Sequence, residues 1–189
     1  MSHVIVSDSR EHNKTSIVVF TNKLLELKPE GVKHVKIWTD GPKSQFKNKY
    51  VMYSMQMLSD KHNVQISWNF SATSHGKGPV DGIGATLKRV ADEKVQRRQC
   101  VINGVEDFYE AVKGGKVQVT MITERVLAKL AYKLQLGQLF DNAEAIIGIT
   151  DFHYIAPGYV TKRYTSGIFD DNSSIDMDIK PNDSDKSED

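Results

Sequence analysis

The sequence contains a single cysteine, Cys100, among 189 residues. One cysteine cannot form an internal disulfide or a zinc knuckle, and such scarcity is typical of a reducing compartment. No apolar run approaches the roughly 20 residues that a membrane-spanning helix needs. The amino-terminal residues lack a basic leader followed by a small-residue cleavage site, so we expect no signal peptide. These absences predict an intracellular protein, nuclear or cytoplasmic.

The net charge of +1 hides two segments of opposite sign. Residues 169–189 contain eight acidic residues and two lysines, a net charge of −6, whereas residues 1–168 contain 16 acidic and 23 basic residues, a net charge of +7. A basic body is typical of nucleic-acid binders, because phosphate contacts supply most non-specific affinity. The acidic tail is either a solvated, disordered terminus or a segment that autoinhibits the basic surface.

Hydrophobic periodicity and capping residues predict alternating strands and helices. The expected strands cover residues 3–7, 32–38 and 64–70, and the expected helices cover residues 13–27, 45–61, 79–98, 105–113 and 122–136. Residues 143–149 suit either a helix or a short strand, and residues 151–164 an irregular aromatic segment. The repeated order of strand and helix predicts an α/β fold with neighbouring parallel strands, whose ligands gather beyond the carboxyl ends of the strands.

Three polar side chains are expected at that edge. Asp40 and His75 each follow a predicted strand, and Asp81 opens the helix after the last of these strands. Two carboxylates at one sheet edge can hold a hard divalent cation such as Mg²⁺. The sequence therefore suggests Asp40 and Asp81 as metal ligands, with His75 beside them.

Residues around the acids suit the phosphates of a polyanion. Gly76 and Gly78 flank Lys77, so backbone N–H groups can approach phosphate oxygens while the lysine adds a positive charge. Lys88 and Arg89 belong to a basic flank of the following helix, which is either a phosphate track or a solvated helix face. The spacing does not match a nucleotide P-loop, because no Lys-Ser/Thr pair follows the glycines.

Each candidate also has an ordinary structural explanation. Asp40 lies in a Thr-Asp-Gly-Pro sequence that is common in turns, and acids such as Asp81 are common in first helical turns. His75 is either a functional histidine or a loop hydrogen-bonding group. Trp68 and Phe70 are expected in the core rather than as a base-stacking platform.

The candidate residues lie in two sequence segments. Residues 38–48, WTDGPKSQFKN, and residues 68–89, WNFSATSHGKGPVDGIGATLKR, together resemble the catalytic core of transposase-like proteins of animal DNA transposons. The resemblance covers about residues 3–98 and implies a ribonuclease H-like fold. In such cores three acidic residues bind two divalent metals, here expected to be Mg²⁺, for DNA cleavage and strand transfer.

The resemblance implies a role for each candidate. Asp40 corresponds to the second acid, Asp81 to the third, and His75 to an accessory histidine. The first acid belongs to an earlier strand than this chain contains, so we expect an amino-terminally truncated copy. Asp8 ends a suitable strand, but we expect that strand to hold it away from the site.

The resulting prediction is a partial ribonuclease H-like core at residues 1–98, a helical carboxy-terminal extension at 99–168 and the acidic tail at 169–189. We expect a transposase-derived nucleic-acid-binding protein that is inactive as this chain alone. Its expected partner is DNA, with a homo-oligomer or a protein partner as further possibilities. The alternative is a protein-interaction domain without nucleic-acid chemistry.

Overall fold

A computed structural model describes residues 2–11, 13–39, 46–70, 79–149, 154–156 and 159–161, with the backbone alone at 79–80 and 159–161. These residues form a mixed α/β fold, as the sequence predicts. In chain order its elements are β1 (Ser2–Val6), α1 (Lys14–Glu26), β2 (His34–Thr39), α3 (Lys49–His62), β3 (Gln65–Phe70), α4 (Pro79–Gln96), α5 (Val105–Val112), β4 (Val117–Met121), α6 (Glu124–Lys133), α7 (Leu136–Asp141), β5 (Tyr154–Ala156) and β6 (Tyr159–Thr161).

The strands form two separate sheets. Strands β2 and β3 are parallel neighbours, as predicted, and the antiparallel strands β5 and β6 extend this sheet in the order β2-β3-β5-β6. Strand β1 does not join them, because it pairs in parallel with β4 to form a two-stranded ribbon. The first predicted strand is therefore correct in position but lies in a different sheet from β2 and β3.

The carboxy-terminal half differs most from the predictions. Strand β4 was not predicted, and the helix expected over 122–136 is instead two helices, α6 and α7, separated by Gln135 in the left-handed conformation. Residues 143–149 form neither a regular α-helix nor a strand. The segment predicted to be irregular contains the short strands β5 and β6.

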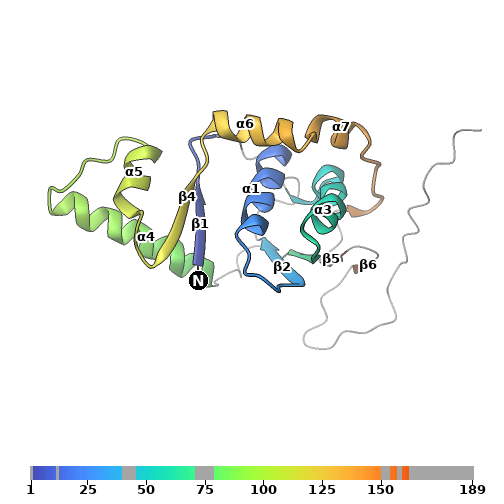
Figure 1. Cartoon of the computed structure of the whole chain (residues 1–189), viewed down its shortest axis with the longest axis horizontal. Coiled ribbons are helices and arrows are strands. Elements are labelled where there is room, and N and C mark those ends of the chain that lie inside the picture. The colour runs from blue at the N-terminus through green and yellow to red at the C-terminus, as the bar shows by residue number, and fades with distance from the viewer. Residues whose placement is uncertain are drawn as a thin grey trace, which may run out of the picture.

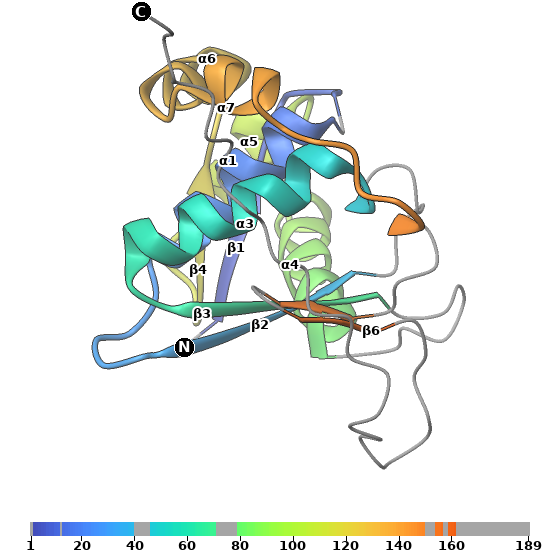
Figure 2. The ribbon, with the colours of Figure 1, turned by 90° about the vertical axis from the view of Figure 1, so that its right-hand side faces the viewer.

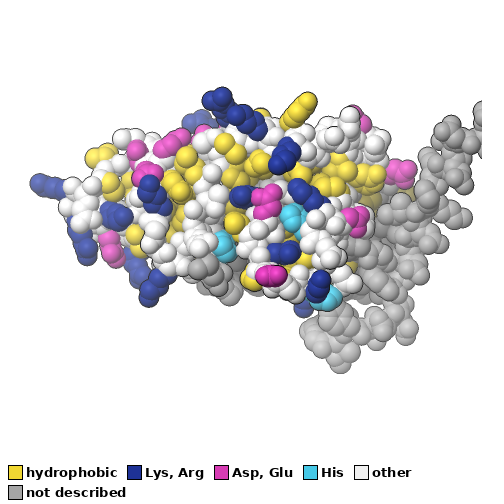
Figure 3. All heavy atoms as spheres, in the orientation of Figure 1, with side chains coloured by type: hydrophobic (Ala, Val, Ile, Leu, Met, Phe, Trp, Pro, Cys, Tyr) yellow, Lys and Arg dark blue, Asp and Glu magenta, His cyan; other side chains and the backbone are white. Residues whose placement is uncertain are grey.

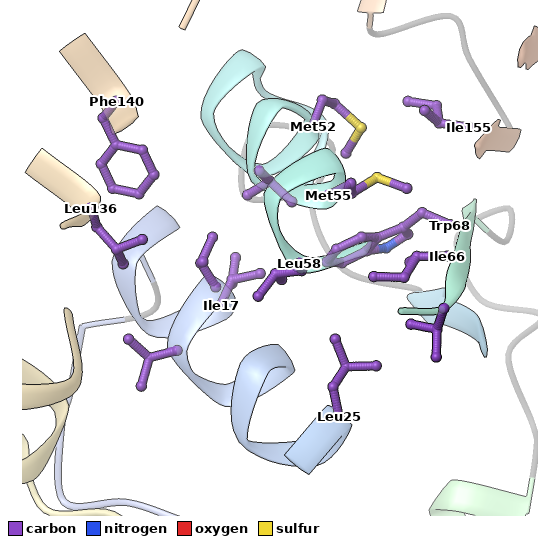
Figure 4. Packing of buried hydrophobic residues seen from close by; sticks show 14 of the residues in the cluster. Ile17, Leu25, Met52, Met55, Leu58, Ile66, Trp68, Leu136, Phe140 and Ile155 are labelled. Carbon is purple, nitrogen blue, oxygen red and sulfur yellow. The ribbon is translucent and has the colours of Figure 1, made fainter. Parts of the chain in front are cut away.

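Helices α1 and α3 cover one face of the four-stranded sheet (Figure 2). Asn13 and Ser16 form a capping box at the start of α1, and the Asn48 side chain accepts a hydrogen bond from Val51 at the start of α3. Helix α3 therefore starts later than the predicted residue 45. The main hydrophobic cluster contains Ile17 of α1, Leu58 of α3, Ile66 and Trp68 of β3, and Phe140 of α7, among other buried residues. In Figure 4 Trp68 and Ile66 point toward the members of this cluster that the helices contribute.

The β1–β4 ribbon lies between two hydrophobic clusters (Figure 1). Successive strand residues point to opposite faces, so Ile5 packs against the main cluster and Val4 against a smaller one formed with α4 and α5. The buried members of this smaller cluster are Leu87, Ala91, Ala111 and Val112. The ribbon therefore pairs a strand that precedes the expected domain boundary at residue 98 with a strand that follows it. The boundary itself stays a prediction.

Within the described residues, no helix combines the length and the apolar character required to cross a membrane.

Candidate functional site

The candidate site lies at the sheet edge where β2 and β3 end. Thr39, the last residue of β2, is paired with Phe70, the last residue of β3. Because the strands are parallel and in register, the segments that begin at residues 40 and 71 leave the sheet at the same edge. The sequence predicts this convergence, and it is confirmed for the two strand ends.

The side chains expected beyond this edge are only partly within the described residues. Asp40 and the loop from His75 to Gly78, which includes Gly76 and Lys77, lie outside them. Their positions and the distance between the Asp40 and Asp81 carboxylates therefore stay predictions.

Side-chain hydrogen bonds and aromatic packing hold the two strand ends together. The Trp68 indole Nε1 donates to the Thr39 hydroxyl at 3.2 Å, and the Asn69 side-chain nitrogen donates to the Ile37 carbonyl at 3.2 Å. The rings of Trp68 and Phe70 stack with centroids 6.3 Å apart. Both side chains are buried, Trp68 with 2% exposure, which confirms that they belong to the core.

Lys47 is a candidate that the sequence analysis did not single out. Its side chain is 5% exposed, and its Nζ lies 4.9 Å from the centroid of the Phe70 ring at the end of β3. A buried cation is costly unless opposite charge, hydrogen bonds or an aromatic face compensates it. A cation held at this edge favours an adjacent anion, either a carboxylate of the protein or a phosphate. In the sequence, the only indication that Lys47 is buried is its position between the aromatic Phe46 and the helix-capping Asn48.

Asp81 is exposed in the first turn of α4. In Figure 1 the beginning of this helix lies beside the amino-terminal end of β1. Lys88 follows seven residues later, about two turns along the helix, so Asp81 and Lys88 share one face.

The basic flank predicted for α4 is present at the surface. Lys88 and Arg89 are both exposed, whereas the preceding residue, Leu87, is buried. Dark blue Lys and Arg side chains are frequent at the α4 and α5 end of the molecule in Figure 3. Asp92 and Glu93 are exposed on the same helix, and Arg97 and Arg98 are exposed just beyond its end, so acidic side chains separate two groups of basic ones on this surface.

Asp8 has a structural role in the other half of the molecule. Its carboxylate Oδ1 accepts a hydrogen bond of 2.6 Å from the backbone N–H of Glu124, at the start of α6. Because Asp8 follows β1, which pairs with β4, it is not at the end of the β2–β3 sheet. This placement agrees with the expectation that Asp8 lies away from the candidate site.

The described residues contain no group of three or more His, Cys, Asp or Glu side chains that could hold a metal ion. Since Asp40 and His75 are not among these residues, this finding leaves the proposed Mg²⁺ site untested. The one described candidate ligand, Asp81, is an oxygen donor, which is the type that Mg²⁺ prefers.

The chain matches a known protein family over most of its length. A family described as a domain of unknown function (DUF8701) matches residues 1–164, which include both sheets and all described helices. No curated protein and no solved structure matches the chain. The family match runs without interruption across residue 98, where the sequence analysis proposed a domain boundary.

Proposed function

We propose that this chain, which belongs to the DUF8701 family, is a transposase-derived nucleic-acid-binding protein with a partial ribonuclease H-like core. The observation that carries the proposal is the in-register parallel pairing of β2 and β3. It brings the beginnings of both motif-bearing segments to one sheet edge. A DNA-binding role also implies an intracellular protein, nuclear or cytoplasmic.

The proposed site divides into acids and phosphate-binding groups. Asp40 and Asp81 are the proposed Mg²⁺ ligands, and His75 is the accessory histidine. When bound, Mg²⁺ supplies positive charge that stabilises a reacting phosphodiester. Carboxylate oxygens fit this ion, although Mg²⁺ requires several well-placed ligands for firm binding.

The phosphate-binding groups belong to the chain itself. The backbone N–H groups at Gly76 and Gly78 and the Lys77 ammonium are proposed to contact phosphate oxygens. Lys88 and Arg89 extend this positive surface along α4, where both side chains are exposed. Such contacts bind DNA without reading its sequence.

We propose that the chain binds DNA but does not cleave it by itself. Two-metal catalysis requires carboxylates that position both ions, and removing one essential group can abolish the effect of the others. Asp40 and Asp81 are two of the three acids that the resemblance implies. Asp8, the acid considered as a substitute in the sequence, accepts a hydrogen bond at the start of α6 instead.

A nuclease assay tests this proposal. We expect the purified chain to show little or no cleavage of single- or double-stranded DNA with Mg²⁺ or Mn²⁺. The Asp40→Ala variant serves as the control for any background nuclease. Cleavage by the natural chain that disappears in Asp40→Ala would contradict the proposal and make the chain a working enzyme.

A protein-interaction domain is the second candidate. Exposed apolar side chains favour it, since Val101, Tyr132 and Ile147 are 71%, 87% and 95% exposed. Burial of such side chains stabilises protein complexes far more than it stabilises contacts with phosphate. Binding of DNA that is absent or indifferent to salt would favour this second function.

A further inference from the structure

One face of the four-stranded sheet carries exposed cationic and aromatic side chains. In β2 the side chains alternate, so that His34, Lys36 and Trp38 are exposed while Val35 and Ile37 pack against the main cluster. Helices α1 and α3 cover the face of Val35 and Ile37 (Figure 2). The opposite face, which we term the outer sheet face, contains the exposed side chains of His34, Lys36, Trp38 and Gln65, the half-buried Ser67 and Tyr154, and Asn69, which is only 5% exposed.

The strand register places these side chains in rows. Trp38 is paired with Asn69, and Asn69 with Tyr154, so an aromatic side chain lies on each side of the central asparagine. Lys36 is paired with Ser67 one row away, about 6.6 Å along the strand. An aromatic ring and a cation thus lie at the spacing of successive outward-facing strand residues.

Trp38 is the most unusual member of this face. Its side chain is 60% exposed, although tryptophan is highly buried on average. Strands β2 and β3 contain no acidic residue, and Lys33 adds a further exposed cation just before β2. The charge of this face is therefore complementary to a polyanion.

We propose that the outer sheet face binds single-stranded DNA, with a base stacked on Trp38 and the backbone phosphates near Lys36. Every base offers a π-face, so aromatic side chains on a basic surface bind single strands without sequence preference. Bases of a duplex are already stacked on each other and cannot occupy an aromatic ring on a sheet in this way. The inference rests on the proposed DNA-binding function and adds a preference for single strands.

The chain contains two tryptophans, so tryptophan fluorescence can report binding at this surface. Trp68 is 2% exposed and Trp38 is 60% exposed, so a bound base changes the emission of Trp38 first. We expect a thymidine oligonucleotide of about 16 residues, near the upper site size of such surfaces, to quench the fluorescence of the full chain. The quenching should saturate and should be absent in Trp38→Phe.

Anisotropy with the labelled oligonucleotide measures the affinity of variants. Trp38→Ala should weaken binding roughly 5- to 100-fold, the effect of losing one stacked base. Tyr132→Ala, which removes an exposed aromatic side chain from α6, is the matched control and should leave the affinity unchanged. Lys36→Ala should lower the slope of log affinity against log salt by about one contact. Circular dichroism of each variant verifies the fold.

The outcomes separate this inference from the proposed function. Salt-dependent DNA binding that is equal in Trp38→Ala and the natural chain would overturn the stacking surface and leave DNA binding intact. Equal affinity for duplex and single strand, or tighter binding of a uridine oligonucleotide, would also overturn the preference for single-stranded DNA. No binding of any DNA at low salt would contradict both the surface and the proposed function.

Discussion

At the scale of single residues, Asn22 connects the two helices that cover the main sheet. This side chain is 2% exposed in α1, and its oxygen accepts hydrogen bonds from Lys61 Nζ at 2.8 Å and from His62 Nε2 at 2.9 Å, both in α3. Its nitrogen donates to Glu26 Oε1 at 3.0 Å. An amide oxygen only accepts hydrogen bonds, so His62 carries a proton on Nε2. Each polar atom of the buried amide therefore has a partner.

His62 makes the stability of this contact depend on pH. Burial lowers the pKa of His62 below its ordinary value of about 6.5, and the neighbouring positive charge of Lys61 lowers it further, against a smaller opposite effect of Glu26. The unfolded chain then binds more protons than the folded chain between the lowered pKa and 6.5. The free energy of unfolding therefore decreases as the pH falls through this window.

We predict that urea denaturation detects this effect between pH 7.5 and pH 5.5. The natural chain should lose stability at the lower pH, and His62→Gln, which keeps a donor for Asn22 but cannot titrate, should lose less. Glu26 does not contribute in this window: burial raises its pKa, but hydrogen bonds from Lys23 and Asn22 outweigh this effect and keep the pKa below about 4.5. An identical pH dependence in the two proteins would contradict the assignment to His62.

At the scale of elements, α4 has one structural face and one exposed face. Leu87 and Ala91 are buried against α5 and the β1–β4 ribbon, whereas Lys88 and Arg89 are exposed. The helical repeat accounts for this division, because residues three and four positions apart share a face. The same helix can therefore stabilise the fold and present the proposed phosphate-binding side chains.

Neighbouring substitutions in α4 should separate these roles. Leu87→Ala should decrease the free energy of unfolding by about 2–5 kcal/mol, because it leaves a cavity in the smaller cluster. Lys88→Ala should change it by less than about 0.5 kcal/mol, as is usual for exposed positions. Urea denaturation of both variants measures the difference. A comparable loss in Lys88→Ala would show that this lysine supports the fold.

Elements with strong local patterns were predictable, and those that depend on distant partners were not. Strand β3 alternates apolar and polar residues, and the capping residues Asn13 and Asn48 mark the starts of α1 and α3. Strand β4 is only five residues long, and its partner β1 lies more than 100 residues earlier in the chain. The break at Gln135 uses a left-handed residue that is neither Gly nor Asn, so no local signal marks it.

At the scale of the whole molecule, the β1–β4 ribbon links two hydrophobic clusters. The local sequence patterns give no sign that these clusters are connected. One cluster contains α1, α3 and β3, and the other contains α4 and α5. The convergence of β2 and β3 was predictable, because consecutive strands joined by a helix commonly lie side by side in parallel. The pairing of β1 across most of the chain has no such rule, and only the three-dimensional structure shows it.

The account of function also depends on charge over the whole molecule. Residues 1–168 carry a net charge of +7, of which Lys77, Lys88 and Arg89 are the proposed phosphate contacts. Affinity that arises from such contacts decreases with salt, since each phosphate contact releases about 0.9 condensed counterions from duplex DNA. The slope of this dependence therefore counts the contacts.

The salt dependence of duplex DNA binding tests the central claim most directly. Fluorescence anisotropy of the natural chain should give a steep decrease of affinity with salt. Replacing Lys77 and Lys88 together by alanine should flatten the slope by about two contacts.

The matched control replaces Lys129 and Lys133, two exposed lysines of α6, and changes the net charge equally. Its slope should stay close to that of the natural chain. Equal flattening by both double variants, or an affinity that does not respond to salt, would contradict a DNA-binding site at this sheet edge.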